Sequence, residues 1–189
     1  GWRGTWAFDG GGCLMNQGIH AIDTMCWLAG EVKSVYGSIA TQLRNIEVED
    51  TAMALLDFKN GAKGVIMGTT ISNVPEDAPE GDKLRIECEF GTILYKNGKV
   101  TLYERCPVSN GKEEVISRIL DDETEGSVVS SANRPENIDM NSHSYIVRDM
   151  ISAIIEDREP YITGESARKS VDVVLGIYES SKTGKRVFL

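Results

Sequence analysis

Hydrophobic residues recur with helical spacing near both ends of the chain and alternate with polar residues in between. Near the N-terminus, four small or apolar residues are separated by three or four positions: Ile19, Ile22, Cys26 and Ala29. This spacing predicts a helix over 14–29 that ends at Gly30. Residues 1–12, which precede it, are expected to form an extended entry segment.

The middle of the chain is rich in β-branched residues and in alternating patterns, which predicts strands. We expect strands over 32–43, 51–58, 62–72, 84–90, 91–95, 100–104 and, at a sheet edge, 115–120. Asn60-Gly61 and Asn97-Gly98 each separate two of these strands, and Asn-Gly is the strongest short hairpin signal. The strands are therefore expected to be mostly antiparallel. The polar stretch 121–135 is expected to be a long loop.

Two more helices and a short strand are predicted after this loop. The apolar stripe of the first helix consists of Tyr145, Ile146, Met150, Ile151 and Ile154, and that of the second consists of Val171, Val174, Leu175 and Tyr178. Glu159-Pro160 ends the first helix, Thr163 begins the second, and 186–189 closes the chain as a strand. The whole pattern predicts an α+β fold: a large, mostly antiparallel sheet with helices packed on one face and the other face free.

Composition narrows the class of protein. A length of 189 residues suits a single domain over 1–189, and the net charge of −9 argues against nucleic acid or an anionic membrane as a partner. No signal peptide or apolar run near the ~20 residues of a membrane helix occurs. The four cysteines have no CxxC spacing and there are only two histidines, so we expect reduced thiols, a cytoplasmic protein and no metal site.

The stretch from Asp9 to Asp23 carries the candidate chemistry. Gly10, Gly11 and Gly12 permit a tight turn and the close approach of a ligand. Beyond the turn, four side chains at helical spacing form a second face of the predicted helix: Asn16, His20, Asp23 and Trp27. A face with an amide, an imidazole and a carboxylate is a plausible place for chemistry on a small polar substrate. A lone histidine near a helix start is also a common surface residue.

Motifs at both ends of the chain resemble the C-terminal domain of the Gfo/Idh/MocA oxidoreductases, the relatives of glucose-fructose oxidoreductase and inositol dehydrogenase. The N-terminal motifs are Trp2 to Trp6, Asp9 to Gly12, Asn16 to Asp23 and Trp27 to Gly30. The C-terminal motifs are His143, Arg148-Asp149, Ala153-Ile154, Pro160 to Arg168 and Ile177 to Lys185. The resemblance spans the chain from end to end.

The resemblance implies a substrate-binding domain that works with a cofactor domain. In the family, NAD or NADP is bound mainly by an N-terminal Rossmann domain, which also carries the catalytic lysine. No G-x-G-x-x-G fingerprint follows a strand in this chain, so we expect it to be a substrate-domain fragment of a longer enzyme. The family also implies a homodimer or homotetramer formed through the open sheet face.

Residue roles follow from the matching positions. His20 occupies the position of the general base that accepts the proton of a sugar, polyol or nucleotide-sugar hydroxyl, while the nicotinamide takes the hydride. Many relatives have aspartate where this chain has Asn16, which can orient a substrate but cannot ionise. Asp23 could orient the imidazole, pair with an arginine or be a solvated helix acid. Gln17 and His143 are further substrate-binding candidates, and His143 also fits a helix-start residue.

Two other functions remain open at this stage. Some relatives use the nicotinamide transiently to cleave glycosidic bonds, with no net oxidation. Others are sugar-sensing regulators that have kept the fold and lost turnover.

Overall fold

The computed structural model describes residues 3–73, 83–96, 99–108, 112–120 and 140–189. The chain forms two compact units, the first made of residues 1–73 and 159–189 and the second of residues 74–158. Each unit contains one four-stranded sheet. Within the described part of the chain, no helix is long and apolar enough to cross a membrane.

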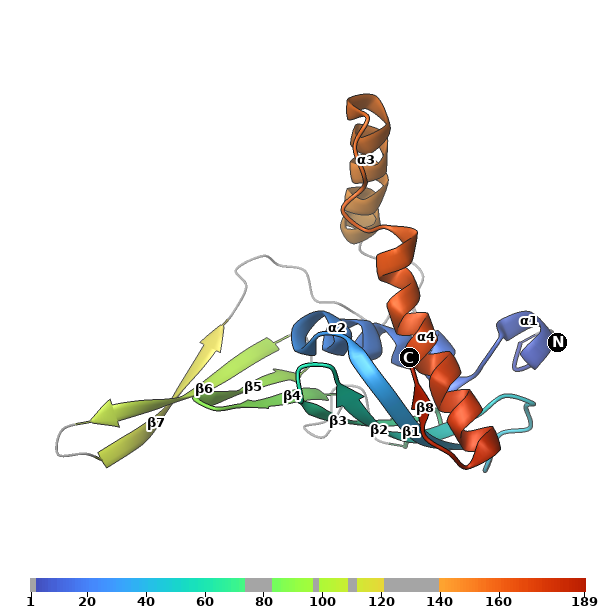
Figure 1. The fold of residues 1–189 in the computed structure, drawn as a ribbon, viewed down its shortest axis with the longest axis horizontal. Coiled ribbons are helices and arrows are strands. Elements are labelled where there is room, and N and C mark those ends of the chain that lie inside the picture. Colours follow the sequence, from blue (N-terminus) through green and yellow to red (C-terminus); the bar gives the residue numbers. More distant parts are fainter. Residues whose placement is uncertain (1–2, 74–82, 97–98, 109–111, 121–139) are drawn as a thin grey trace. The chain divides into compact units, whose positions relative to one another are not determined.

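The first unit combines one sheet with the helices at the two ends of the chain (Figure 1). Its helices are α1 (Trp6–Asp9), the π-helix η1 (Leu14–Gly18), α2 (Ile19–Ala29) and α4 (Gly164–Thr183). Its strands are β1 (Val32–Ala40), β2 (Thr51–Phe58), β3 (Lys63–Thr69) and β8 (Val187–Phe188). The strand order is β3-β2-β1-β8, and every neighbouring pair is antiparallel.

The core of the first unit lies between one face of this sheet and the helices. Strands β1 and β2 alternate buried and exposed residues, as a half-buried antiparallel strand should. Helix α4 packs on β1, where Ile177 lies against Gly37. Helix η1 places the Leu14 side chain beside Gly68 of β3, where a Cβ on the glycine would lie 3.7 Å from Leu14 Cδ2. Leu14 and Ile177 are fully buried, so the two ends of the chain share one core.

The opposite face of the first sheet is apolar and exposed. The register of β1, β2 and β3 places Tyr36, Leu55 and Val65 in one row and Met53 and Met67 in the next. Their exposed fractions run from 44% for Tyr36 to 78% for Met67. Five large apolar side chains on neighbouring strands form a continuous apolar surface, which we call the open face.

The second unit contains a meander and one helix. Its elements are β4 (Lys83–Cys88), β5 (Gly91–Lys96), β6 (Lys99–Val108), β7 (Lys112–Leu120) and α3 (Met140–Glu156). The strands pair in sequence order, with β7 at an edge. Much of the predicted apolar stripe of α3 is exposed, including Tyr145, Met150 and Ile154. Only Ala153 is buried among the described residues of this helix.

The structure confirms the α+β class and the predicted order of elements. Both Asn-Gly hairpin predictions agree with the strand register: β2 pairs with β3 across residues 59–62, and Lys96 pairs with Lys99, although residues 97 and 98 lie outside the described residues. Thr163 begins α4, and its hydroxyl oxygen accepts a hydrogen bond from the Ser166 N–H, as a helix N-cap does. The predicted loop over 121–135 lies outside the described residues.

Two expectations differ from the structure. The strands form two four-stranded sheets, whereas the sequence suggested one large sheet. Alternation identifies strands, but it does not specify which strands pair across a long connection. Residues 6–9 form a short helix instead of an extended segment, because Asp9 Oδ2 accepts a hydrogen bond from the Gly4 N–H and Gly10 ends the turn with a φ of 70°. A four-residue helix is too short to show a helical repeat.

Candidate active site

The glycine-rich turn approaches other parts of the protein, and this explains two of its three glycines. A Cβ on Gly12 would lie well inside contact distance of the Glu49 carbonyl oxygen, and one on Gly11 would collide with the Tyr178 hydroxyl. The sequence suggested that the glycines admit a ligand. In the structure, the space beside them is filled by Glu49 and Tyr178.

Glu49 holds this turn from the buried side. Its carboxylate accepts hydrogen bonds from the Gly12 N–H at 2.8 Å, the Leu14 N–H at 2.9 Å and the Tyr178 hydroxyl at 2.8 Å. Its carbonyl oxygen accepts a fourth, from the Cys13 N–H at 3.0 Å. Burial, together with the bond to Glu49, raises the pKa of Tyr178 above its usual value, so the hydroxyl remains a donor. Three consecutive backbone amides are therefore bound to one residue.

Asp50, the next residue, holds a different loop. Its carboxylate is fully buried and accepts hydrogen bonds from the N–H groups of Gln42, Leu43 and Arg44, each at 2.9 Å. These bonds hold the pKa of Asp50 well below its usual range. The sequence analysis assigned no role to residues 44–50, which lie between two predicted strands, and so missed both carboxylates. The only local signal was two adjacent acids directly before a strand.

The helix that follows the turn carries the predicted site residues. Its first turn is the π-helix η1, which contains Asn16 and Gln17, and α2 then carries His20 and Asp23. All four side chains are exposed. Gln17 Nε2 lies 3.5 Å from Asn16 Oδ1, the limit of a hydrogen bond. Two amides and an imidazole thus face outward within two turns of the helix start.

Asp23 has a partner on another helix. Its Oδ1 accepts a hydrogen bond of 2.5 Å from the hydroxyl of Ser170, a buried residue of α4. Asp23 therefore joins α2 to α4. Within the described residues, no hydrogen bond joins it to His20.

The remaining predicted residue, His143, is not brought to this site by anything the structure describes. It lies in α3 of the second unit, and its side chain is outside the described residues. Its role in substrate binding stays a prediction.

The four cysteines are free, and the pKa of two of the thiols is raised. Burial, with the nearby carboxylates of Glu49 and Asp50, raises the pKa of the Cys13 thiol to about 12. Burial, with Asp23 nearby, raises that of Cys26 to about 11. Among the described residues, no group of three or more histidine, cysteine or acidic side chains could hold a metal ion.

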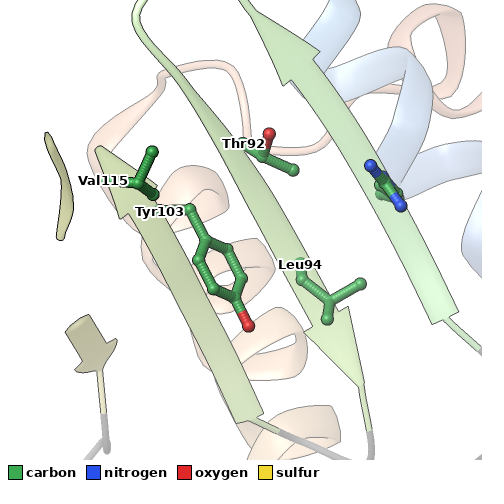
Figure 2. Close-up of a pocket in the computed structure, with 5 residues that line it drawn as sticks. Thr92, Leu94, Tyr103 and Val115 are labelled. Carbon is green, nitrogen blue, oxygen red and sulfur yellow. The ribbon is translucent and has the colours of Figure 1, made fainter. Parts of the chain in front are cut away.

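The described residues include two shallow hollows that are open to solvent. One, of about 460 Å³, is bounded by residues 43–46 and 71–73 of the first unit. The other, of about 370 Å³, lies on the sheet of the second unit, where Figure 2 shows Thr92, Leu94, Tyr103 and Val115. Arg85 completes its lining and is paired with Glu87, so its charge is already compensated.

The chain resembles known proteins over its whole length. The family model for the GFO/IDH/MocA C-terminal domain matches residues 1–94. The WlbA dehydrogenase from Bordetella pertussis, solved with NADH and UDP-GlcNAcA, is 29% identical to this chain, with a TM-score of 0.69. The WlbA dehydrogenase from Chromobacterium violaceum, solved with the same two ligands, is 30% identical, with a TM-score of 0.66. Each match covers 100% of this chain and 49% of the relative.

A levoglucosan dehydrogenase, solved with NADH and levoglucosan, shares the fold at 16% identity, with a TM-score of 0.73 over 100% of this chain and 53% of its own. The chain thus spans about half the length of these relatives. The motifs at both ends, the α+β architecture and these matches agree. The chain belongs to the Gfo/Idh/MocA family and corresponds to the C-terminal domain of its members.

Proposed function

We propose that this chain is the substrate-binding domain of an NAD(P)-dependent oxidoreductase that oxidises a hydroxyl of a sugar, a polyol or a nucleotide sugar to a ketone. The observation that carries the proposal is the exposed His20, on a helix whose start is fixed by a buried carboxylate. The WlbA relatives, solved with NADH and UDP-GlcNAcA, support a nucleotide sugar in particular.

The chemistry requires two separate acceptors. Oxidation of an alcohol removes a hydride from carbon and a proton from oxygen. A bound nicotinamide supplies the hydride acceptor. His20 accepts the hydroxyl proton, because a neutral imidazole can act as a general base and this one is open to solvent, to which the proton is then passed.

The other predicted residues orient the substrate and the base. Asn16 and Gln17 each offer donor and acceptor atoms to sugar hydroxyls, one turn before His20. Asp23 uses one carboxylate oxygen for Ser170, which leaves Oδ2 to orient the imidazole three residues away. His143 contacts the substrate only in the assembled full-length enzyme.

NAD or NADP is bound mainly by a Rossmann domain of the full-length protein. The relatives are about twice as long as this chain, which supports a further domain. Large aromatic side chains of the first unit are exposed, including Trp27 at 80% and Phe8 at 75%. Another domain packed on them would remove this apolar surface from water.

The open face of the first sheet binds a second copy of the chain. Its five large apolar side chains lie on three neighbouring strands, and soluble monomers rarely expose a continuous surface of this kind. Burial of this face would give the expected homodimer or homotetramer.

The proposed function is tested in the full-length protein with NAD and NADP and a panel of sugars, polyols and nucleotide sugars. The wild type is expected to form reduced cofactor, and His20→Ala to lower kcat by a factor of about 100 or more. The matched control is Arg168→Ala, at an exposed position on α4, which is expected to retain turnover.

Three outcomes contradict the proposal in different ways. Full turnover by His20→Ala removes the base assignment. Release of free sugar without accumulation of reduced cofactor identifies the glycosidase-type reaction. Binding of a sugar without any turnover identifies a sugar-sensing regulator.

A further inference from the structure

Glu49 caps the helix that carries the site residues, although it lies 35 positions from the helix start. The N–H groups of Gly12 and Leu14 donate to the two carboxylate oxygens, and the N–H of Cys13 donates to the Glu49 carbonyl. The first amides of a helix have no acceptor within the helix itself. Glu49 supplies acceptors to three of them.

The carboxylate is buried, and its partners are all hydrogen-bond donors without charge. Glu49 is 1% exposed, and the described residues place no cation beside it. A buried charge of this kind is tolerated only when its oxygens are satisfied, and charge-assisted bonds of this type are stronger than neutral ones. The helix start is thus held by a group that cannot move without losing these bonds.

An amide cannot replace this carboxylate. The side chain of glutamine has one acceptor oxygen and one NH₂ group, which only donates. If the NH₂ replaces Oε2, the Gly12 N–H loses its acceptor, and if it replaces Oε1, the Leu14 N–H does. Glu49→Gln therefore frees one end of the turn while preserving the volume of the side chain.

The position of the site residues depends on this cap. Asn16 donates its backbone N–H to the Gly12 carbonyl at 3.0 Å, and His20 follows one helical turn later. We propose that Glu49 is a positioning residue that fixes the start of the helix and thereby places Asn16 and His20 against the substrate. The inference rests on the proposed function for its catalytic part, but the cap itself can be tested without turnover.

The experiment compares three variants of the full-length protein: Glu49→Gln, Asp50→Asn and Tyr178→Phe. Asp50→Asn makes the same chemical change one residue along, but its carboxylate binds the amides of residues 42–44 instead of the turn. Tyr178→Phe removes one donor to Glu49 and leaves all three backbone amides bound to it. Amide hydrogen exchange and steady-state kinetics are measured for each.

For Glu49→Gln we expect at least tenfold faster exchange in the segment 12–20 and at least a tenfold loss of kcat. For Asp50→Asn we expect faster exchange at 42–44, unchanged exchange at 12–20 and kcat within threefold of the wild type. Tyr178→Phe should resemble the wild type in kcat and in exchange over 12–20. A melting temperature for each variant shows whether Glu49→Gln loses kcat beyond what its stability loss explains.

Each contrary result is informative. Unchanged exchange at 12–20 in Glu49→Gln overturns the cap. Faster exchange with wild-type kcat overturns the positioning role, and so does an equal loss of kcat in Asp50→Asn. If the wild type turns over no substrate, the proposed function fails, and exchange over 12–20 still decides whether Glu49 caps the helix. If Glu49→Gln does not fold, Glu49→Asp is compared with Asp50→Glu by the same two measurements, with the same outcomes.

Discussion

Ser170 on α4 donates a hydrogen bond to Asp23 on α2, and so joins the two helices through residues that are 147 positions apart in the sequence. Ser170 is buried, whereas Asp23 is exposed, so the bond lies at the rim of the interface between the helices. Asp23 lies three residues beyond His20. The contact therefore helps to orient α2 beyond His20, whereas the glycine-rich turn holds the other end of the helix.

Ser170→Ala is expected to lower the free energy of unfolding by about 1 kcal/mol, because a single net hydrogen bond is worth about that much. A denaturant titration measures the loss. A double-mutant cycle with Asp23→Ala isolates the pair, and we expect a coupling energy of roughly 0.5 kcal/mol or more. Strictly additive effects would show that the contact contributes nothing to stability.

Asp50 makes the stability of the fold depend on pH in the acidic range. Its folded pKa is depressed, so its contribution is fully present above the usual aspartate pKa near 3.8 and is lost as the pH falls below that value. Asp50→Asn is expected to lower the melting temperature at pH 7. The difference from the wild type should shrink between pH 4 and pH 2. A difference that stays constant over this range would contradict the assignment.

The sequence predicted helices and strands better than it predicted which distant residues bond to one another. The hairpin at Asn60-Gly61 and the start of α4 at Thr163 depend on local chemistry, which a short window contains. The acceptors of the glycine-rich turn could not be found in this way, because Glu49 is 35 positions away from Leu14 and reads locally as an ordinary acid before a strand.

The hydrophobic pattern also could not predict the type of helix at the site. Residues 14–18 form a π-helix, yet apolar residues at three- and four-residue intervals look the same whether the first turn is α or π. Exposure of Asn16, His20, Asp23 and Trp27 agrees with the predicted second face of the helix. Their roles stay predictions until turnover is measured.

Thiol reactivity should differ between the cysteines. Cys13 is 4% exposed and its pKa is about 12, whereas Cys88 is exposed. Because the thiolate is the reactive form, iodoacetamide at pH 8 should modify Cys88 first and Cys13 only after unfolding. Mass spectrometry of the timed reaction gives the order. Early modification of Cys13 in native protein would show that the turn opens readily.

The open face can be tested by a charge placed on it. Met53→Lys is expected to shift the full-length protein towards smaller species, because a buried ammonium at a subunit interface costs several kcal/mol. Size-exclusion chromatography with light scattering measures the mass. The control is Leu175→Lys, at a 48% exposed position on the helical side of the same unit. Equal masses for wild type and Met53→Lys would remove this face from the interface.

Leu14 connects the turn to the core. Its side chain is fully buried and packs on β3, so Leu14→Ala is expected to cost about 3 kcal/mol of unfolding free energy. Leu28→Ala, at a 46% exposed position on α2, should cost less than about 1 kcal/mol. Chemical denaturation of both variants gives the comparison, and similar losses would show that Leu14 is not a core residue.

The filled space beside Gly11 and Gly12 determines where this protein can be engineered. Glu49 and Tyr178 occupy the volume that a new side chain at either glycine would require, so a library that varies these glycines will mostly yield misfolded protein. Asn16 and Gln17 are exposed and make no bond to the buried core through their side chains. Substrate preference should therefore be altered by randomising these two positions while residues 11–14 and Glu49 are kept fixed.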